Sequence, residues 1–179
     1  MKVVTSATEL PSACAFIPTM GALHAGHASL FSLGHRYSEN VVASIFLNPL
    51  QFENEEDLAK YPRTPEKDIE LAEAAGVTHL WLPHQDEIYP AGYVKQSAGP
   101  IGDLYEGKSR PGHFDGVLTV VRRLFDLVKP RVAIFGEKDF QQLQLIKTIA
   151  AEVEIISAPT IRESDGLALS SRNIRLTPE

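Results

Sequence analysis

The sequence predicts an α/β fold with a parallel, doubly wound sheet. Short apolar runs alternate with amphipathic helical segments at close spacing from residue 13 to residue 157. Several of the runs are apolar almost throughout, as expected of parallel strands covered on both faces. Most of them end in glycine, proline or polar residues, which then lie at the carboxyl edge where open α/β sheets place their ligands.

The length and composition are those of a globular protein with one domain, or with one domain and a fragment of another. The chain has 179 residues, of which 44% are hydrophobic and 22% are charged, so neither a disordered nor a fibrous protein is indicated. The net charge of -6 argues against a nucleic-acid surface, which needs a basic face. Any anionic ligand must therefore meet local cations.

The single cysteine and the hydropathy pattern favour a cytoplasmic protein. Cys14 lies inside an apolar run, which is typical of a core residue, and one cysteine cannot form an internal disulfide. No apolar segment reaches the roughly 18 residues of a membrane span, and the N-terminus lacks a signal-peptide pattern. We expect no membrane association.

The first clear element is an apolar strand over residues 13–17, because residues 1–11 give few signals. A turn containing Gly21 and the start of a helix follow it. His24 and His27 would share one helical face near unpaired backbone N–H groups, which suits a phosphate or another anion. The alternative is that each histidine is an ordinary surface or capping residue.

A helix ending near residues 34–37 and a second buried strand over residues 41–47 come next. Asn48 and Gln51 follow that strand directly, so both are expected at the ligand-binding edge of the sheet. For Gln51 alone, a surface-loop position is the alternative.

Residues 53–63 are acidic and rich in turn formers, and we expect a solvated loop there. Thr64 as N-cap and Pro65 at the first helical position then start a helix that ends at Gly76. The pattern of residues 79–82 predicts the third strand.

Residues 84–112 contain proline, glycine and tyrosine without periodicity, and the segment is too long for an ordinary connection. A binding loop, a lid or a poorly ordered excursion is expected. The spacing around Lys108 is not that of a phosphate-binding P-loop. Asp115 is the expected N-cap of a core helix that extends to about Val128.

A fourth buried strand over residues 132–135 leads into the sequence Gly-Glu-Lys-Asp at 136–139. A helix follows, and we expect residues 154–157 to form a fifth strand. Asp139 and Gln142 have the separation of a capping box, which is the structural alternative to a role in binding.

Ser170, Ser171 and Arg172 offer two hydroxyls and a guanidinium fork, which suit a polyphosphate. Residues 177–179 look like the entrance to another helix. The histidine pair, the 136–139 turn and this serine–arginine loop all fall on one sheet edge, so a nucleoside triphosphate is the natural ligand class.

Six motifs, in the order in which they occur along the chain, resemble those of the pantothenate synthetase family. The resemblance extends from residue 17 to the end of the chain. They occupy residues 18–27, 46–52, 61–63, 112–117, 136–143 and 165–173. The resemblance implies a Rossmann-like domain of the HIGH-type nucleotidyltransferase superfamily. It also implies ATP-dependent joining of pantoate to β-alanine through a pantoyl adenylate, with release of AMP and pyrophosphate. The family uses Mg²⁺ and usually forms homodimers.

The resemblance also assigns the site residues. His27 would be the catalytic proton donor, and His24, Lys138 and Arg172 would act beside it on the phosphates. Pantoate would contact Gln51, Gln142 and Asn48. The implied ATP-binding residues are Met20, Gly21, Ala22, Leu23, His24, Ala25, Gly26, His27, Gly136, Glu137, Lys138, Asp139, Ile161, Leu169, Ser170, Ser171 and Arg172. The metal ligands stay unknown, with Asp68 and the acidic loop before it as candidate neighbours.

Three departures from the family pattern are visible. The segment before Phe16 is short, Leu169 stands where methionine is common, and we expect the family's smaller C-terminal domain to be absent, as in a truncated chain. We therefore expect residues 1–179 to form the ATP- and pantoate-binding domain, with slow turnover because closure over the acyl adenylate is lost. Another nucleotidyltransferase and a non-catalytic binding module are the alternatives.

Overall fold

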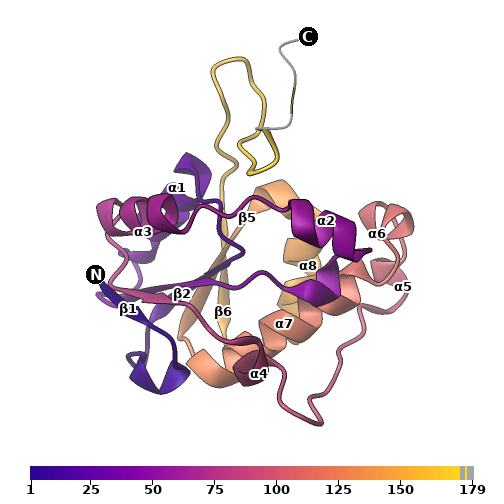
Figure 1. The fold of residues 1–179 in the computed structure, drawn as a ribbon, viewed down its shortest axis with the longest axis horizontal. Coiled ribbons are helices and arrows are strands. Elements are labelled where there is room, and N and C mark those ends of the chain that lie inside the picture. The colour runs from indigo at the N-terminus through magenta and orange to yellow at the C-terminus, as the bar shows by residue number, and fades with distance from the viewer. Residues whose placement is uncertain (174–175, 177–179) are drawn as a thin grey trace.

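Six parallel strands form the centre of the computed structural model, which describes residues 1–173 and 176 (Figure 1). The strands are β1 (Lys2–Val4), β2 (Ala15–Thr19), β3 (Val41–Ile45), β4 (His79–Trp81), β5 (Val132–Gly136) and β6 (Glu154–Ala158). They lie in the order β1-β4-β3-β2-β5-β6. The α/β class with a doubly wound parallel sheet is therefore confirmed. The helix start expected at residues 177–179 lies outside the described residues.

Helices cover both faces of this sheet. They are α1 (Ala25–Gly34), α2 (Glu55–Lys60), α3 (Pro65–Ala74), α4 (Gln85–Ile88), α5 (Gly99–Gly102), α6 (Glu106–Ser109), α7 (His113–Val128) and α8 (Phe140–Ile149). Three 3₁₀ turns are also present: η1 (Ala7–Glu9), η2 (Pro49–Gln51) and η3 (Glu137–Asp139). Among the described residues, no helix is long and apolar enough to span a bilayer.

The strands alternate their side chains between two hydrophobic layers. Ile17 packs with Phe31 of α1 and Ala72 of α3 on one face. Its neighbour Phe16 belongs to the other layer, with Leu118 and the rest of the apolar stripe of α7 and with α8. Figure 1 shows these helix pairs on opposite sides of the strands.

The connections reverse direction between β2 and β5, which makes this the switch point of the sheet. After β2 the chain continues toward β3, and after β5 it continues toward β6. β2 pairs with β5 only at Ala15 and Phe16, whereas its pairing with β3 runs over all five residues. The two central strands therefore separate toward their carboxyl ends, where α/β sheets bind ligands.

Two expected loops contain helices. Within residues 53–63, Asn54 caps α2 by accepting from the Asp57 N–H at 2.9 Å, so the acidic residues form a helix start that favours negative charge. Residues 84–112 contain α4, α5 and α6, which are joined by turns and irregular segments. Each of these three helices has only four residues, which is too short for a visible sequence period.

One further expectation was wrong, and one strand was missed. Asp115 does not begin α7, because Gly112 is the N-cap and the Asp115 carboxylate accepts from the Ala98 N–H at 2.7 Å. The sixth strand, β1, was not predicted. It has three residues at the sheet edge, and Val4 is its one buried side chain, so no alternation can show in the sequence.

Candidate active site

A cavity of about 260 Å³ lies at the carboxyl ends of β2 and β5. It gathers most of the residues that the sequence singled out, from five separate segments of the chain. These are Met20, His24, Gly26, His27, Asn48, Gln51, Gly136, Lys138, Asp139, Gln142, Ile161, Leu169, Ser170, Ser171 and Arg172. Gly21, Ala22, Leu23, Ala25 and Glu137 belong to the same turns but do not line the cavity.

The turn after β2 has an unusual backbone. Gly21 has φ 83° and Ala22 has φ 49°, so two consecutive residues lie in the left-handed region. That conformation costs a non-glycine residue about 1–2 kcal/mol. A Cβ at Gly21 would stand 3.0 Å from Asp68 Oδ2 and 3.1 Å from Ile45 Cγ2. The turn therefore needs an external restraint.

Asp68 of α3 supplies that restraint. Its Oδ2 accepts from the Ala22 N–H at 2.9 Å, and its Oδ1 accepts from the Leu23 N–H at 2.8 Å. The Thr64 hydroxyl donates to the same Oδ1 at 2.9 Å, so Thr64 orients the carboxylate although it sits at the N-cap position of α3. Asp68 is 2% exposed. Its oxygens thus bind the backbone of the turn, a role that sequence reasoning missed.

His24 and His27 cap α1 reciprocally. His24 Nδ1 accepts from the Gly26 N–H at 3.1 Å, and His27 Nδ1 accepts from the His24 N–H at 3.3 Å. A backbone N–H can only donate, so each Nδ1 is unprotonated and each neutral ring carries its hydrogen on Nε2. The capping alternative and the site interpretation are therefore compatible, because each histidine caps with one nitrogen and keeps the other as a donor.

The charge state follows from the surroundings. Burial lowers the pKa of His27 to about 3, with further contributions from His24 and Lys138. Burial and Lys138 also lower the pKa of His24. At neutral pH, His27 is consequently a neutral hydrogen-bond donor rather than an imidazolium acid.

The opposite wall of the cavity comes from β5–α8 and from the chain after β6, which extends as a loop at the top of Figure 1. Lys138 Nζ contacts Asp139 Oδ1 at 2.9 Å. The Ser171 hydroxyl donates to the Ala22 carbonyl at 2.9 Å, which ties the serine–arginine loop to the histidine turn. The Arg172 guanidinium lies 6.0 Å from the ring centroid of Tyr61.

The capping alternative for Asp139 and Gln142 is not what the structure shows. Asp139 occupies the N-cap position of α8 without a capping bond from its side chain, and its carboxylate accepts from Lys138. Gln142 lines the cavity.

Asn48 and Gln51 lie in and beside η2 at the end of β3. Asn48 is 1% exposed, and its amide contacts four groups: Leu50 N–H and Tyr89 hydroxyl on the oxygen, Gln51 Oε1 and Gly116 carbonyl on the nitrogen. Gln51 is therefore buried against α7 rather than displayed on a surface loop.

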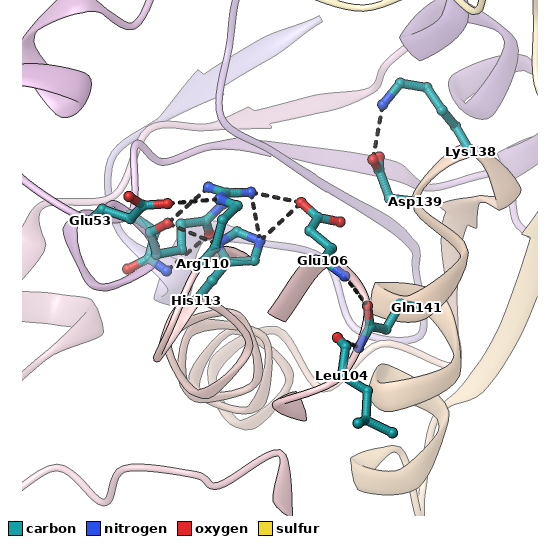
Figure 2. A network of polar contacts seen from close by, with 10 residues as sticks. Glu53, Leu104, Glu106, Arg110, His113, Lys138, Asp139 and Gln141 are labelled. Carbon is teal, nitrogen blue, oxygen red and sulfur yellow. Dashed lines mark hydrogen bonds and ion pairs between the residues drawn. The ribbon is translucent and has the colours of Figure 1, made fainter. Parts of the chain in front are cut away.

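A second network holds the main chain of Gln51 through His113 and Arg110. Figure 2 shows these two side chains beside Glu106 and Glu53. His113 Nδ1 donates to the Gln51 carbonyl at 2.8 Å, and His113 Nε2 accepts from Arg110 Nη1 at 3.1 Å. Arg110 lies between two carboxylates, at 2.8 Å from Glu106 and 3.8 Å from Glu53. Burial lowers the pKa of His113, which agrees with the neutral tautomer.

The α5–α6 segment is fastened to α8 by one side chain. Gln141 donates to the Ile101 and Leu104 carbonyls at 2.9 and 2.8 Å and accepts from the Glu106 N–H at 3.1 Å (Figure 2). Through Glu106 this contact supports Arg110. The sequence excluded a P-loop around Lys108 but indicated no role for Arg110.

Comparison with known proteins decides the family. The model of the pantoate-beta-alanine ligase family matches residues 1–179. The chain belongs to the pantoate-beta-alanine ligase family. It is 54% identical to a pantothenate synthetase of Acidothermus cellulolyticus and 54% identical to one of Legionella pneumophila, with 91% of the chain aligned in both cases. The chain spans 55% and 67% of the lengths of these two relatives.

Solved structures of pantoate-beta-alanine ligases have the same fold. The pantothenate synthetase from Thermus thermophilus superposes with a TM-score of 0.93 at 48% identity, over 99% of this chain and 68% of that one. A pantoate-beta-alanine ligase from Francisella tularensis, complexed with beta-gamma ATP and beta-alanine, gives a TM-score of 0.92 at 39% identity. Its alignment covers 99% of this chain and 74% of that protein. The resemblance inferred from the six motifs is therefore confirmed.

Proposed function

We propose that this chain binds ATP and pantoate and joins pantoate to β-alanine through a pantoyl adenylate, releasing pyrophosphate and AMP. The observation that carries the proposal is that one cavity is lined by two kinds of polar group. His24, His27, Lys138 and Arg172 supply cationic and N–H donors, whereas Asn48, Gln51 and Gln142 supply uncharged amides. The Francisella relative, which was solved with beta-gamma ATP and beta-alanine, supports the nucleotide and the amine substrate.

The donor side suits the triphosphate of ATP. The two Nε2–H groups of the histidine pair are fixed by their capping bonds, and fixed donors stabilise charge that grows on a reacting phosphate. We propose that His27 acts there as a neutral donor and that His24, Lys138 and Arg172 share the phosphates. Ser170, Ser171, Gly136, Ile161 and Leu169 also line the cavity, and we propose that they complete the ATP site.

The first step is attack by the pantoate carboxylate on the α-phosphorus. One carboxylate oxygen forms the new P–O bond, and the bond to the bridging oxygen of pyrophosphate breaks. Gln51 and Gln142 are proposed to orient the acid without adding a repulsive negative charge. No enzyme nucleophile is needed, in agreement with Cys14, which is fully buried and whose thiol has a pKa raised to about 11 by burial.

The second step is attack by the β-alanine amine on the activated carbonyl. The new C–N bond forms, the C–O bond to AMP breaks, and the amine nitrogen loses its extra proton to solvent. Exclusion of water matters here, because the acyl adenylate hydrolyses readily. We propose that residues 1–179 form the ATP- and pantoate-binding domain and that they turn over more slowly than a relative of full length.

Mg²⁺ is implied by the family, but the described residues do not form a cage for it. Among residues 1–173 and 176, no group of three or more His, Cys, Asp or Glu side chains could hold a metal ion. The Asp68 oxygens accept from backbone N–H groups, as described above. Mg²⁺ would therefore be bound chiefly through the phosphates that accompany it. A homodimer and a cytoplasmic setting, where ATP is supplied, complete the proposal.

The proposal is tested by omitting each substrate in turn. AMP should form only when ATP, pantoate and β-alanine are all present, whereas pyrophosphate should form with ATP and pantoate alone. Equal AMP release with unrelated acids would contradict the proposal. A nucleotidyltransferase that stops at an adenylylated product would instead release pyrophosphate at a rate that β-alanine does not change, and would form no AMP.

A binding module formed by residues 1–179 is the second candidate, and these residues span 55% of one relative and 67% of another. Calorimetry with ATP and with pantoate separates binding from turnover. Substrate binding with AMP release far below that of the Legionella relative would support the module. Equal turnover by both proteins would exclude it.

A further inference from the structure

The direction in which the Asn48 amide points is fixed by two groups whose roles cannot change. The Leu50 backbone N–H, which can only donate, lies 3.2 Å from Oδ1. The Gly116 carbonyl, which can only accept, lies 3.1 Å from Nδ2. The Tyr89 hydroxyl adds a third contact at 2.6 Å and must donate to Oδ1. The oxygen and nitrogen of this side chain are thus assigned by chemistry.

The orientation of the Asn48 amide also determines the orientation of the Gln51 side-chain amide. The second hydrogen of Asn48 Nδ2 points at the Gln51 amide, 3.0 Å away, so the Gln51 atom at that contact must be its oxygen. The Gln51 main chain is fixed as well, because its carbonyl accepts from His113 at 2.8 Å and from Arg110 at 3.2 Å. Gln51 is therefore held at its main chain by His113 and Arg110 and at its side-chain oxygen by Asn48.

The remaining end of the Gln51 side chain is its NH₂ group. Gln51 lines the cavity, and within the part of the chain that the structure describes its Nε2 has no protein acceptor. Two N–H bonds are consequently available to a ligand. Asn48, by contrast, already uses both hydrogens and both acceptor positions on protein groups.

We infer that Asn48 is a positioning residue that makes the Gln51 subsite a pure hydrogen-bond donor. Such a subsite accepts the carboxylate or hydroxyl oxygen of a hydroxy acid and disfavours an ammonium group, which brings only further N–H donors. The inference rests on the proposed function for the identity of the acid, pantoate. It goes beyond it by stating which end of Gln51 meets the acid and which residue decides this.

The substitution Asn48→Asp tests the inference directly. A carboxylate can keep the contacts with the Leu50 N–H and the Tyr89 hydroxyl, but it can only accept where Nδ2 donated. The Gln51 amide must then turn its NH₂ toward the new carboxylate and its oxygen toward the cavity. The KM for pantoate should rise at least about tenfold, while the KM for ATP stays within about twofold.

Tyr89→Phe is the matched control. It removes one hydrogen bond from the same network but leaves the Leu50 and Gly116 contacts that set the amide direction. The KM for pantoate should stay within about threefold of the unsubstituted protein. Equal losses in the two variants, or parallel losses for pantoate and ATP, would show a merely structural network and overturn the inference.

Neutron diffraction from the deuterated protein gives a test that needs no substrate, because deuterium distinguishes the nitrogen from the oxygen. The inference requires the deuterated NH₂ group of the Gln51 side chain to face the cavity. The side-chain oxygen in that position would overturn the inference. If the amide faces the cavity but pantoate does not bind, the proposed substrate is wrong while the positioning role of Asn48 stands.

Discussion

The backbone N–H of His24 donates to Nδ1 of His27 at 3.3 Å. The contact that caps helix α1 therefore also decides which nitrogen of His27 carries the ring hydrogen. It makes His27 Nδ1 an acceptor and so leaves the ring hydrogen on Nε2. The ring centroids of the two histidines lie 4.2 Å apart, so the second ring is constrained by the first. Each histidine thus caps the helix with Nδ1 and keeps its ring hydrogen on Nε2.

The roles of the two ring nitrogens of His27 can be tested separately by substitution. Asparagine places an acceptor near the position of Nδ1, whereas glutamine places an N–H donor near that of Nε2. His27→Asn should preserve the start of α1 and keep the free energy of unfolding within about 1 kcal/mol, yet lower kcat by about 10²–10³-fold. His27→Gln should retain more activity and lose more stability. Denaturant titration together with AMP release measures both, and the reverse order would refute the assignment.

Acid should destabilise the protein through the same histidine. In the unfolded chain His27 binds a proton near pH 6.5, but its pKa falls to about 3 in the folded protein. Between these values the unfolded state binds more protons, so the stabilisation is complete above pH 6.5 and is lost as the pH falls toward 3. From pH 7 to pH 5 the unfolding free energy should fall by about 1–2 kcal/mol more than in His27→Asn. Parallel pH curves for the two proteins would contradict this.

The sequence predicted those features that depend on local periodicity. The stripe of apolar residues identified α7, and the apolar runs identified β2 to β6, because a buried strand needs a continuous run and a core helix needs a 3.6-residue period. The carboxyl-edge rule then placed His24, Lys138 and Arg172 around one cavity, as the structure has them. These inferences needed no knowledge of long-range contacts.

The features that were missed depend on contacts between distant segments. Asp68 contacts a turn 45 and 46 residues earlier in the chain, and in the sequence it is simply an acidic residue in the first turn of a helix. The network from Glu106 through Arg110 to His113 likewise depends on short helices that Gln141 holds from α8. No local pattern marks such residues, since their partners are brought together only by the fold.

Removing one acceptor of Asp68 should loosen the histidine turn. In Asp68→Asn one oxygen becomes an NH₂ group, which faces a backbone N–H of Ala22 or Leu23 instead of accepting from it. We expect a loss of about 1–3 kcal/mol in stability and a higher KM for ATP, because the left-handed Ala22 loses its restraint.

Glu66→Gln is the control for Asp68→Asn. It also removes a negative charge from the first turn of α3, but its side chain is exposed. Thermal unfolding and ATP kinetics should leave this control close to the parent protein. Similar effects in the two variants would mean that helix-end charge, rather than the restraint of the turn, explains Asp68.

Gly116→Ala should reverse the usual effect of alanine in a helix. Alanine normally stabilises a helix interior by about 0.5–1 kcal/mol relative to glycine. At Gly116, however, a Cβ would collide with the Leu50 carbonyl oxygen and would lie 2.9 Å from the backbone nitrogen of Gln51. Helix α7 and η2 must then move apart, which breaks the contact between Asn48 and the Gly116 carbonyl. We expect a destabilisation of about 2–4 kcal/mol together with weaker pantoate binding.

Chemical denaturation measures the change in stability of Gly116→Ala, and calorimetry measures its affinity for pantoate. A variant that is stabilised, or that keeps its affinity for pantoate, would show that the close approach of α7 does not position Gln51.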